Sequence, residues 1–341
     1  MAAPYRLTPA EAQMLALQRR PPSFAARAAV VYDITTDRLL LAQNAHVPLA
    51  PASLTKMMTA LLARQYLDLD DRVTIPQEVA QMPSPMRLRP GEQVSVRALL
   101  YGMMLTSDNA AAVALAQAAA GDVETFVQWM NERAADMGLE NTRFVNPHGL
   151  DAAGHVSTAW DLARLARALL DDPVLADIVA TREIQVGRWH LTNTNRLLFD
   201  REDVVGVKTG TTLLAGECLV AAFQEGDHTL ITVVLGARDR YAVTEALWAY
   251  YRQTYAWTRL QLPPGNMNRV LGAWGERRFK AVAEPSVLLP RWALGNLTVY
   301  RQVQRPIATE SGWNWPSSAG QAIFRLGPHP LKEVGLMWTG Q

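Results

Sequence analysis

The chain has 341 residues, of which 49% are apolar and 19% are charged, and its formal net charge is +1. This composition predicts a soluble globular protein with a large domain and a smaller one. It excludes a basic nucleic-acid-binding protein, an intrachain disulfide and a cysteine-based metal site, because Cys218 is the only cysteine, and no apolar run reaches the roughly 18 residues of a membrane span.

The N-terminal segment predicts a short helix. Thr8 to Glu11 form a capping box with proline at the first helical position, so a helix is expected through about Arg19, with Pro21 and Pro22 ending it. The first residues lack the charged start and apolar segment of a signal peptide. Two alternatives follow: a cytosolic protein, or one whose export signal has been removed.

The next elements are an antiparallel hairpin, residues 27–33 and 38–43, and a helix from Pro51 to about Tyr66. Ser53 and Lys56 are three residues apart, which places both side chains on one helix face, one turn from each other. A serine hydroxyl becomes a good nucleophile when a nearby base takes its proton, and a desolvated lysine can be that base. The apolar flanks predict a packed helix start that carries a nucleophile and its base.

Lysine is rare here, since 29 of the 33 basic residues are arginine. Arginine does not deprotonate in proteins and so cannot act as a base, whereas lysine can. Two of the four lysines, Lys56 and Lys208, lie inside the motifs described here.

Three helices are expected next, at residues 95–105, 110–120 and 123–137, from apolar residues at helical spacing. Ser107, Asp108 and Asn109 separate the first two. These are preferred helix N-cap residues, so a capping role and a catalytic role both remain open.

Helices at 158–170, 173–180 and 242–255 follow the irregular stretch around Asn146 to Asp151. A short strand at 204–207 ends in Lys208, Thr209, Gly210 and Thr211, and further strands are expected at 217–223 and 229–236. His148 and Cys218 are interpreted as structural.

After two consecutive prolines, short strands at 268–272, 279–283, 297–303, 322–326 and 333–338 predict a β domain. The expected domains are therefore residues 1–262, which are catalytic, and 263–341, which are β-rich.

Three motifs occur in order: Ser53-Leu54-Thr55-Lys56, Ser107-Asp108-Asn109 and Lys208-Thr209-Gly210. This set is typical of serine β-lactamases and penicillin-binding proteins. Over residues 25–258 the chain more closely resembles the D-alanyl-D-alanine carboxypeptidases, peptidase family S11. The stretches that carry this resemblance are Leu88 to Gly91, Gly138 to Thr142, Asn146 to Asp151, Asn193 to Asn195 and Val207 to Thr211.

The resemblance implies a role for each motif residue. Ser53 would attack the carbonyl between two D-alanines and form an acyl-enzyme. Lys56 would take its proton, and Lys208 would help to hold Lys56 uncharged. Ser107 would relay a proton to the leaving amine, and Asn109 would bind the substrate amide.

The resemblance also implies how the substrate is held. The backbone N–H groups of Ser53 and Thr211 would form the oxyanion hole. Lys208, Thr209 and Arg238 would bind the terminal carboxylate beside Gly210. No metal or other cofactor is expected.

The implied fold is the serine β-lactamase/transpeptidase-like α/β fold: an antiparallel sheet with helices on both faces and an all-helical subdomain, plus the C-terminal β domain. The implied partners are a peptidoglycan stem peptide ending in D-Ala-D-Ala and β-lactam antibiotics as covalent inhibitors, with no nucleic acid. The implied location is the cell envelope, outside the cytoplasm, which favours a removed export signal. Contact with a membrane surface stays open, although the amphipathic anchor that often ends this family is not visible.

Two rival functions share this scaffold. A class A β-lactamase would need a Glu-x-x-Leu-Asn loop after Ser-Asp-Asn, and residues 146–151 occupy that region instead. A catalytically idle penicillin-binding or wall-binding protein is disfavoured by the intact nucleophile, base and cation.

Overall fold

A computed structural model describes residues 22–339, so the helix expected at residues 8–19 lies outside the described part. The described chain divides into two compact units, residues 22–249 and 250–339, and each is treated by itself. The division falls earlier than residue 262, the boundary expected from the sequence. It does so because residues 255–259 pair with a strand of the second unit.

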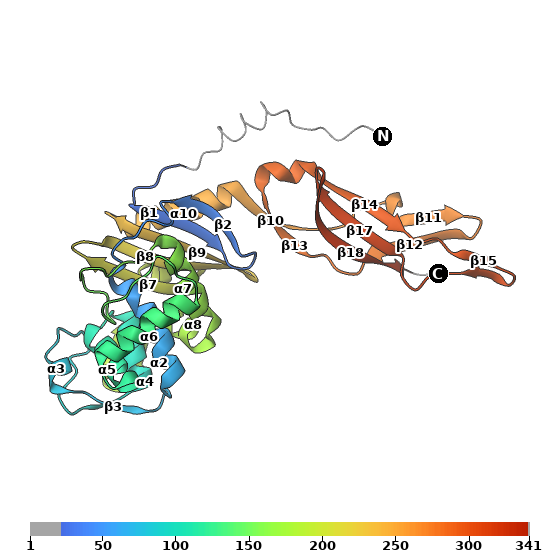
Figure 1. Ribbon diagram of the computed structural model, residues 1–341. Coiled ribbons are helices and arrows are strands. Elements are labelled where there is room, and N and C mark those ends of the chain that lie inside the picture. The colour runs from blue at the N-terminus through green and yellow to red at the C-terminus, as the bar shows by residue number, and fades with distance from the viewer. Residues whose placement is uncertain (1–21, 340–341) are drawn as a thin grey trace. The chain divides into compact units, whose positions relative to one another are not determined.

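The first unit is built on a five-stranded antiparallel sheet with strand order β2-β1-β9-β8-β7 (Figure 1). The predicted hairpin is confirmed as β1 and β2, and the strand before Lys208 runs on through Thr212 at one edge of the sheet. The strands are β1 (Ala28–Asp33), β2 (Arg38–Gln43), β7 (Val204–Thr212), β8 (Gly216–Glu225) and β9 (His228–Ala237).

Both faces of this sheet are covered by helices, because apolar side chains occupy both faces of the central strands. On one face Trp248 of α10 (Arg240–Thr254) stacks on Phe223 of β8, with ring centroids 4.4 Å apart. The other face packs against α7 (Ala159–Asp171) and α8 (Pro173–Ala180), as Figure 1 shows. This arrangement confirms the expected fold class.

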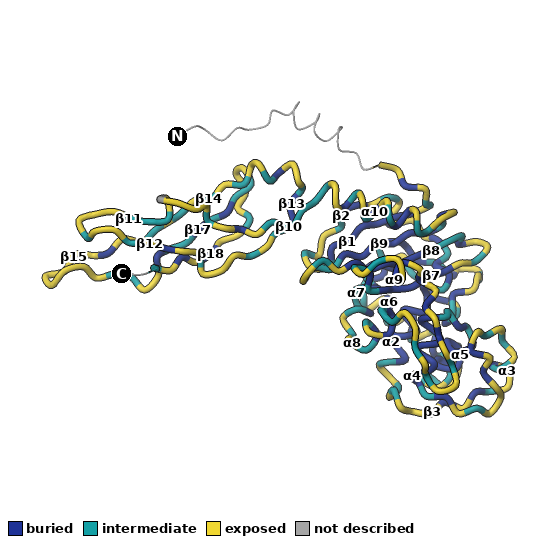
Figure 2. Tube along the Cα trace, turned by 180° about the vertical axis from the view of Figure 1, so that it is seen from behind, coloured by how far each residue is buried: buried dark blue, intermediate teal, exposed yellow. Residues whose placement is uncertain are grey.

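A helical layer lies next to β7 and contains the first two motifs. Its helices are the 3₁₀ turn η1 (Ala52–Thr55), α2 (Lys56–Tyr66), α3 (Gln77–Ala80), α4 (Val96–Leu105), α5 (Asn109–Ala120), α6 (Val123–Asp136) and α9 (Leu197–Asp200). Helix α5 is almost entirely buried over residues 110–116, as the dark blue tube of Figure 2 indicates. The ends of these helices are therefore fixed by packing on several sides.

Side-chain caps set where these helices begin. Asp108 accepts the Ala111 N–H at the start of α5, and Ser95 accepts the Ala98 N–H at the start of α4. Two short hairpins complete this unit. They are β3 (Arg72–Thr74) with β4 (Gln93–Ser95), and β5 (Glu183–Val186) with β6 (Trp189–Thr192).

The second unit is rich in strands, as predicted. A five-stranded antiparallel sheet of order β11-β12-β18-β17-β14 encloses a small core around Phe279 and Phe324. The elements are β10 (Tyr255–Arg259), η2 (Asn266–Asn268), β11 (Arg269–Gly272), β12 (Gly275–Ala281), β13 (Ser286–Pro290), η3 (Arg291–Asn296), β14 (Leu297–Val303), β15 (Ile307–Thr309), β16 (Gly312–Asn314), β17 (Gly320–Leu326) and β18 (His329–Thr339).

Among residues 22–339, no single helix has both the length and the apolar character to cross a membrane. One bent pair, α5 with α6 at 87°, meets the length and composition requirement jointly.

Candidate active site

Ser53 and Lys56 lie where the 3₁₀ turn η1 passes into α2. The Lys56 Nζ is 2.9 Å from the Ser53 Oγ, as the three-residue spacing predicts. Lys56 is completely buried. Burial lowers the pKa of its amine well below the usual value of 10.5, and the charge of Lys208 lowers it further, partly opposed by Asp108. The amine next to the serine is therefore biased toward its neutral form.

Two carbonyl oxygens fix the direction of this amine. Lys56 Nζ donates to Asn109 Oδ1 and to the backbone oxygen of His148, each at 2.7 Å. A neutral amine has two N–H groups and one lone pair. Since both carbonyls can only accept, the two N–H groups are used there, and the lone pair is left for the Ser53 hydroxyl proton. This geometry suits a base that deprotonates Ser53.

Strand β7 carries the second buried lysine. Lys208 is 1% exposed, and its Nζ donates to the Thr209 carbonyl at 3.1 Å. Burial, followed by the nearby Arg240, lowers the pKa of Lys208 to about 7. The Thr209 hydroxyl lies 2.8 Å from the hydroxyl of Thr194, in the Asn193 to Asn195 stretch.

Two glycines allow the chain to approach the nucleophile closely from both sides. A Cβ atom on Gly210 would lie 3.0 Å from the Ser53 backbone nitrogen. A Cβ on Gly149, whose φ is +91°, would lie 1.9 Å from the Ala52 oxygen. Only glycine fits at Gly149, because it supplies both the positive φ and the missing side chain. Strand β7 and the loop at residues 146–150 thus hold the nucleophile turn between them.

The loop between α4 and α5 separates its capping function from its chemical one. Asp108 is completely buried; one carboxylate oxygen caps α5 and the other accepts bonds from the Met86 N–H and the Ser84 hydroxyl. Asn109, the residue after Asp108, contacts Lys56. Ser107, the residue before Asp108, is half-buried and has a φ of +61°. The capping alternative therefore holds for Asp108, while the residues on either side remain available to the site.

Of the two nearby arginines, the structure places Arg240 at the third motif rather than Arg238. Arg238 is exposed on the turn between β9 and α10. Arg240 donates through Nη1 to the Gly210 carbonyl at 3.0 Å and through Nη2 to Thr211 Oγ1 at 2.5 Å, and Glu217 accepts from its Nε at 3.2 Å. The sequence had no means of ranking two arginines two residues apart at a strand end.

The support behind the site was predicted only in part. His148 was interpreted as structural, and its backbone oxygen is the part that reaches Lys56. Burial lowers the pKa of its imidazole to about 4, so the ring is neutral at pH 7. Thr55 also contacts His155, and Gly149 lies against the Ala52 carbonyl. Their contacts span about a hundred residues of sequence, so no local pattern predicts them.

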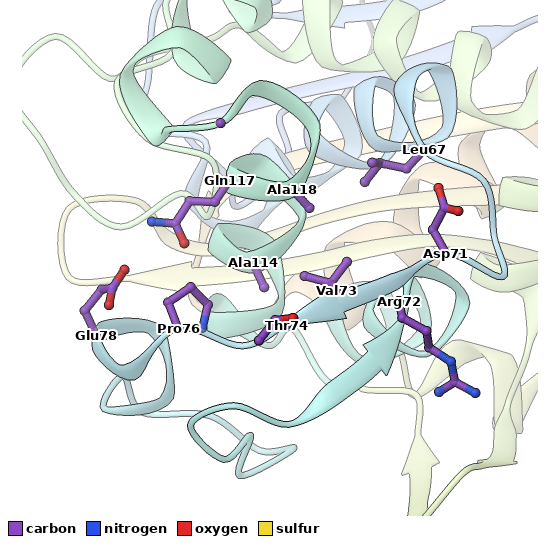
Figure 3. Close-up of a pocket in the computed structure, with 11 residues that line it drawn as sticks. Leu67, Asp71, Arg72, Val73, Thr74, Pro76, Glu78, Ala114, Gln117 and Ala118 are labelled. Carbon is purple, nitrogen blue, oxygen red and sulfur yellow. The ribbon is translucent and has the colours of Figure 1, made fainter.

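A separate cavity of about 590 Å³ lies between β3, α3 and α5, where Gln117, Glu78 and Thr74 line it (Figure 3). None of the motif residues borders it. The cavity therefore does not belong to the constellation around Ser53.

A family model described as D-alanyl-D-alanine carboxypeptidase, Peptidase_S11, matches residues 16–239. The chain is 37% identical over 322 residues to D-alanyl-D-alanine carboxypeptidase DacC of Escherichia coli K12, covering 89% of this chain and 79% of DacC. It is 40% identical over 223 residues to D-alanyl-D-alanine carboxypeptidase DacF of Bacillus subtilis 168, covering 62% of this chain and 57% of DacF. The crystal structure of penicillin binding protein 6B from Escherichia coli superimposes with a TM-score of 0.71 at 29% identity, covering 93% of this chain and 96% of that one.

Proposed function

Because this chain belongs to the D-alanyl-D-alanine carboxypeptidase family of serine peptidases, Peptidase_S11, we propose that Ser53 removes the terminal D-alanine from peptidoglycan stem peptides through an acyl-enzyme. The observation that carries the assignment is the completely buried Lys56 amine, 2.9 Å from the Ser53 hydroxyl and held by two carbonyl acceptors. It provides the nucleophile with a base whose lowered pKa favours the neutral form before the reaction begins.

Acylation begins when the Lys56 lone pair takes the Ser53 proton and the serine oxygen attacks the penultimate D-alanine carbonyl. The new C–O bond forms first and gives a tetrahedral intermediate, and the peptide C–N bond breaks when that intermediate collapses. The leaving amine takes up the proton from Lys56, relayed by the Ser107 hydroxyl. Free D-alanine departs, and Lys56 is neutral again.

The oxyanion of the tetrahedral intermediate is stabilised by the backbone N–H groups of Ser53 and Thr211. Ser53 lies in the first turn of η1, where N–H groups lack an acceptor within the helix. A Cβ on Gly210 would lie 3.0 Å from the Ser53 nitrogen, so β7 passes close to this turn, which supports the Thr211 N–H as the second donor.

The terminal carboxylate binds at the end of β7, beside the cation of Lys208 and the Thr209 hydroxyl. Arg240 takes the place that Arg238 had in the sequence-based prediction, because its guanidinium contacts residues 210 and 211. Asn109 donates its amide N–H₂ to the substrate carbonyl, since its Oδ1 is already engaged by Lys56.

Deacylation uses the same groups in reverse order. A water molecule loses a proton to Lys56, directly or relayed by the Ser107 hydroxyl, as its oxygen attacks the ester, and the Ser53 oxygen leaves and takes that proton back. A β-lactam acylates Ser53 by the same route, but its opened ring keeps the leaving nitrogen attached. The location that fits this substrate is the cell envelope. We propose no nucleic-acid partner and no membrane contact.

The test is release of D-alanine from diacetyl-Lys-D-Ala-D-Ala, compared between the wild-type protein and Ser53→Ala. We expect release by the wild type and none by the variant, with fluorescent penicillin labelling only the wild type. No labelling of Ser53 would support an idle binding protein. Turnover of a chromogenic β-lactam at many cycles per second would support a β-lactamase.

A further inference from the structure

A buried histidine that the proposed chemistry does not use lies behind the nucleophile turn. His155 is 3% exposed, and its Nδ1 accepts the Val145 N–H at 3.0 Å. An Nδ1 that accepts a hydrogen bond carries no proton, so the network places the ring proton on Nε2. Nε2 is 2.8 Å from the Oγ1 of Thr55. The ring therefore donates a hydrogen bond to the Thr55 hydroxyl.

The Thr55 hydroxyl connects His155 by hydrogen bonds to the peptide that precedes Ser53. Because its oxygen accepts from His155, its single proton is directed to the Ala52 carbonyl, 2.8 Å away. Ala52 has a φ of +51°, in the left-handed region that residues other than glycine seldom adopt. The two hydrogen bonds thus hold a backbone conformation that alanine does not favour by itself.

The held carbonyl and the Ser53 N–H belong to one peptide plane and point in opposite directions from it. Fixing the Ala52 oxygen therefore also fixes the direction of the Ser53 N–H. We propose that His155 and Thr55 are positioning residues that aim the Ser53 N–H at the oxyanion. The inference rests on the proposed function, in which that N–H stabilises the tetrahedral intermediate.

Packing alone does not set this direction. A Cβ on Gly149 would lie 1.9 Å from the Ala52 oxygen, and a Cβ on Gly210 would lie 3.0 Å from the Ser53 nitrogen, so backbone confines the peptide on two sides. These contacts limit how far the peptide can shift, while rotation about its long axis remains. The Thr55 hydrogen bond opposes that rotation, because turning the plane draws the carbonyl away from the hydroxyl proton.

The test compares acylation of Ser53 by an ester substrate and by its thiono analogue, in which C=S replaces the reacting C=O. Sulfur is a weaker hydrogen-bond acceptor than oxygen, so a well-aimed oxyanion hole favours the oxygen substrate. The ratio of the two rates does not depend on the fraction of folded protein. It therefore separates aiming of the N–H from a general loss of stability.

We expect Thr55→Val to slow acylation by the oxygen ester by about ten-fold or more, up to the roughly 10²–10³-fold cost of losing one oxyanion donor completely. The rate ratio should fall with it. Thr55→Ser, which keeps the hydroxyl, should restore the wild-type ratio. Thr59→Val is the matched control: Thr59 is buried one turn further along, in α2, and its hydroxyl donates to the Pro147 carbonyl at 2.6 Å. It should keep the wild-type ratio.

A wild-type ratio in Thr55→Val would overturn the proposal. If that variant does not fold, His155→Phe decides, because it keeps a ring but removes the donor; its ratio should fall, and an unchanged ratio overturns the proposal. His155→Gln, whose amide can donate toward Thr55, should recover part of the ratio. Wild-type protein that releases D-alanine no faster than Ser53→Ala would overturn the proposed function instead.

Discussion

Replacing Lys208 by methionine should stabilise the protein at neutral pH and remove its activity. Lys208 is fully buried, and its pKa of about 7 lies below the usual 10.5. At about 1.4 kcal/mol for each pH unit, that difference costs about 5 kcal/mol of folding free energy wherever the folded protein carries the charge. Methionine has a similar shape and no charge to desolvate. It loses the bond to the Thr209 carbonyl, worth about 1 kcal/mol.

The sign of the pH dependence follows from the direction of this pKa. Between pH 7 and 10.5 the unfolded chain binds the Lys208 proton more tightly than the folded chain does, so the stability of the wild type rises with pH. The cost is complete below pH 7 and is about 2 kcal/mol at pH 9. After subtracting the lost hydrogen bond, we expect Lys208→Met to gain about 4 kcal/mol at pH 6 and about 1 kcal/mol at pH 9.

Urea unfolding followed by far-UV circular dichroism at the two pH values measures both gains. Lys280→Met is the control, because Lys280 is exposed on β12 and its substitution should show no such pH dependence. Equal stability of Lys208→Met and the wild type at pH 6, or a gain that does not change between pH 6 and pH 9, would refute the reasoning.

Three further substitutions test other parts of the site. Lys56→Arg places a permanent charge beside Ser53 and cannot deprotonate, so acylation by fluorescent penicillin should slow by about 10²–10⁴-fold. Gly149→Ala places a methyl group 1.9 Å from the Ala52 oxygen, and the displaced nucleophile turn should acylate about 100-fold more slowly in the same assay. Arg240→Met should raise the KM for cleavage of the D-Ala-D-Ala bond more in a peptide with a free terminal carboxylate than in its terminal amide, whereas Arg238→Met should change neither KM.

A specific result would contradict each of these three predictions. Rapid acylation of Lys56→Arg would mean that another group takes the serine proton. Gly91 also has a positive φ, but no heavy atom lies within 4 Å of the Cβ it would gain. Equal acylation rates in Gly149→Ala and Gly91→Ala would show that close packing on the nucleophile is unimportant. An equal change in KM for the free and the amidated peptide would show that Arg240 does not bind the terminal carboxylate.

The parts of the site that the sequence could predict are those determined by short spacing. Ser53 and Lys56 share a face because they are three residues apart, and Asp108 begins α5 because a carboxylate accepts the N–H three residues on. Both rules act within one helical turn. They hold whatever the remainder of the chain does.

The parts that the sequence could not predict depend on how distant segments meet. The choice between Arg238 and Arg240 depends on the path of the turn between β9 and α10, which no spacing rule specifies. His155 reaches Thr55 across one hundred residues, and the Ala52 φ of +51° is set by contacts on both sides of the chain. The short strands β4, β5 and β6 were not predicted, because each has only three or four residues.

Burial explains why the two site positions carry lysine in a chain whose other basic residues are mostly arginine. Lys56 and Lys208 are completely or almost completely buried in the site, whereas Lys280 and Lys332 are exposed. A buried arginine would have to stay charged, with its guanidinium desolvated, but a buried lysine can release its proton and lower the cost. Its pKa is then lowered from the usual value toward the pH at which proton transfer is efficient. In a chain that otherwise uses arginine, desolvation therefore opposes arginine at the two site positions, and nothing comparable acts at the two exposed ones.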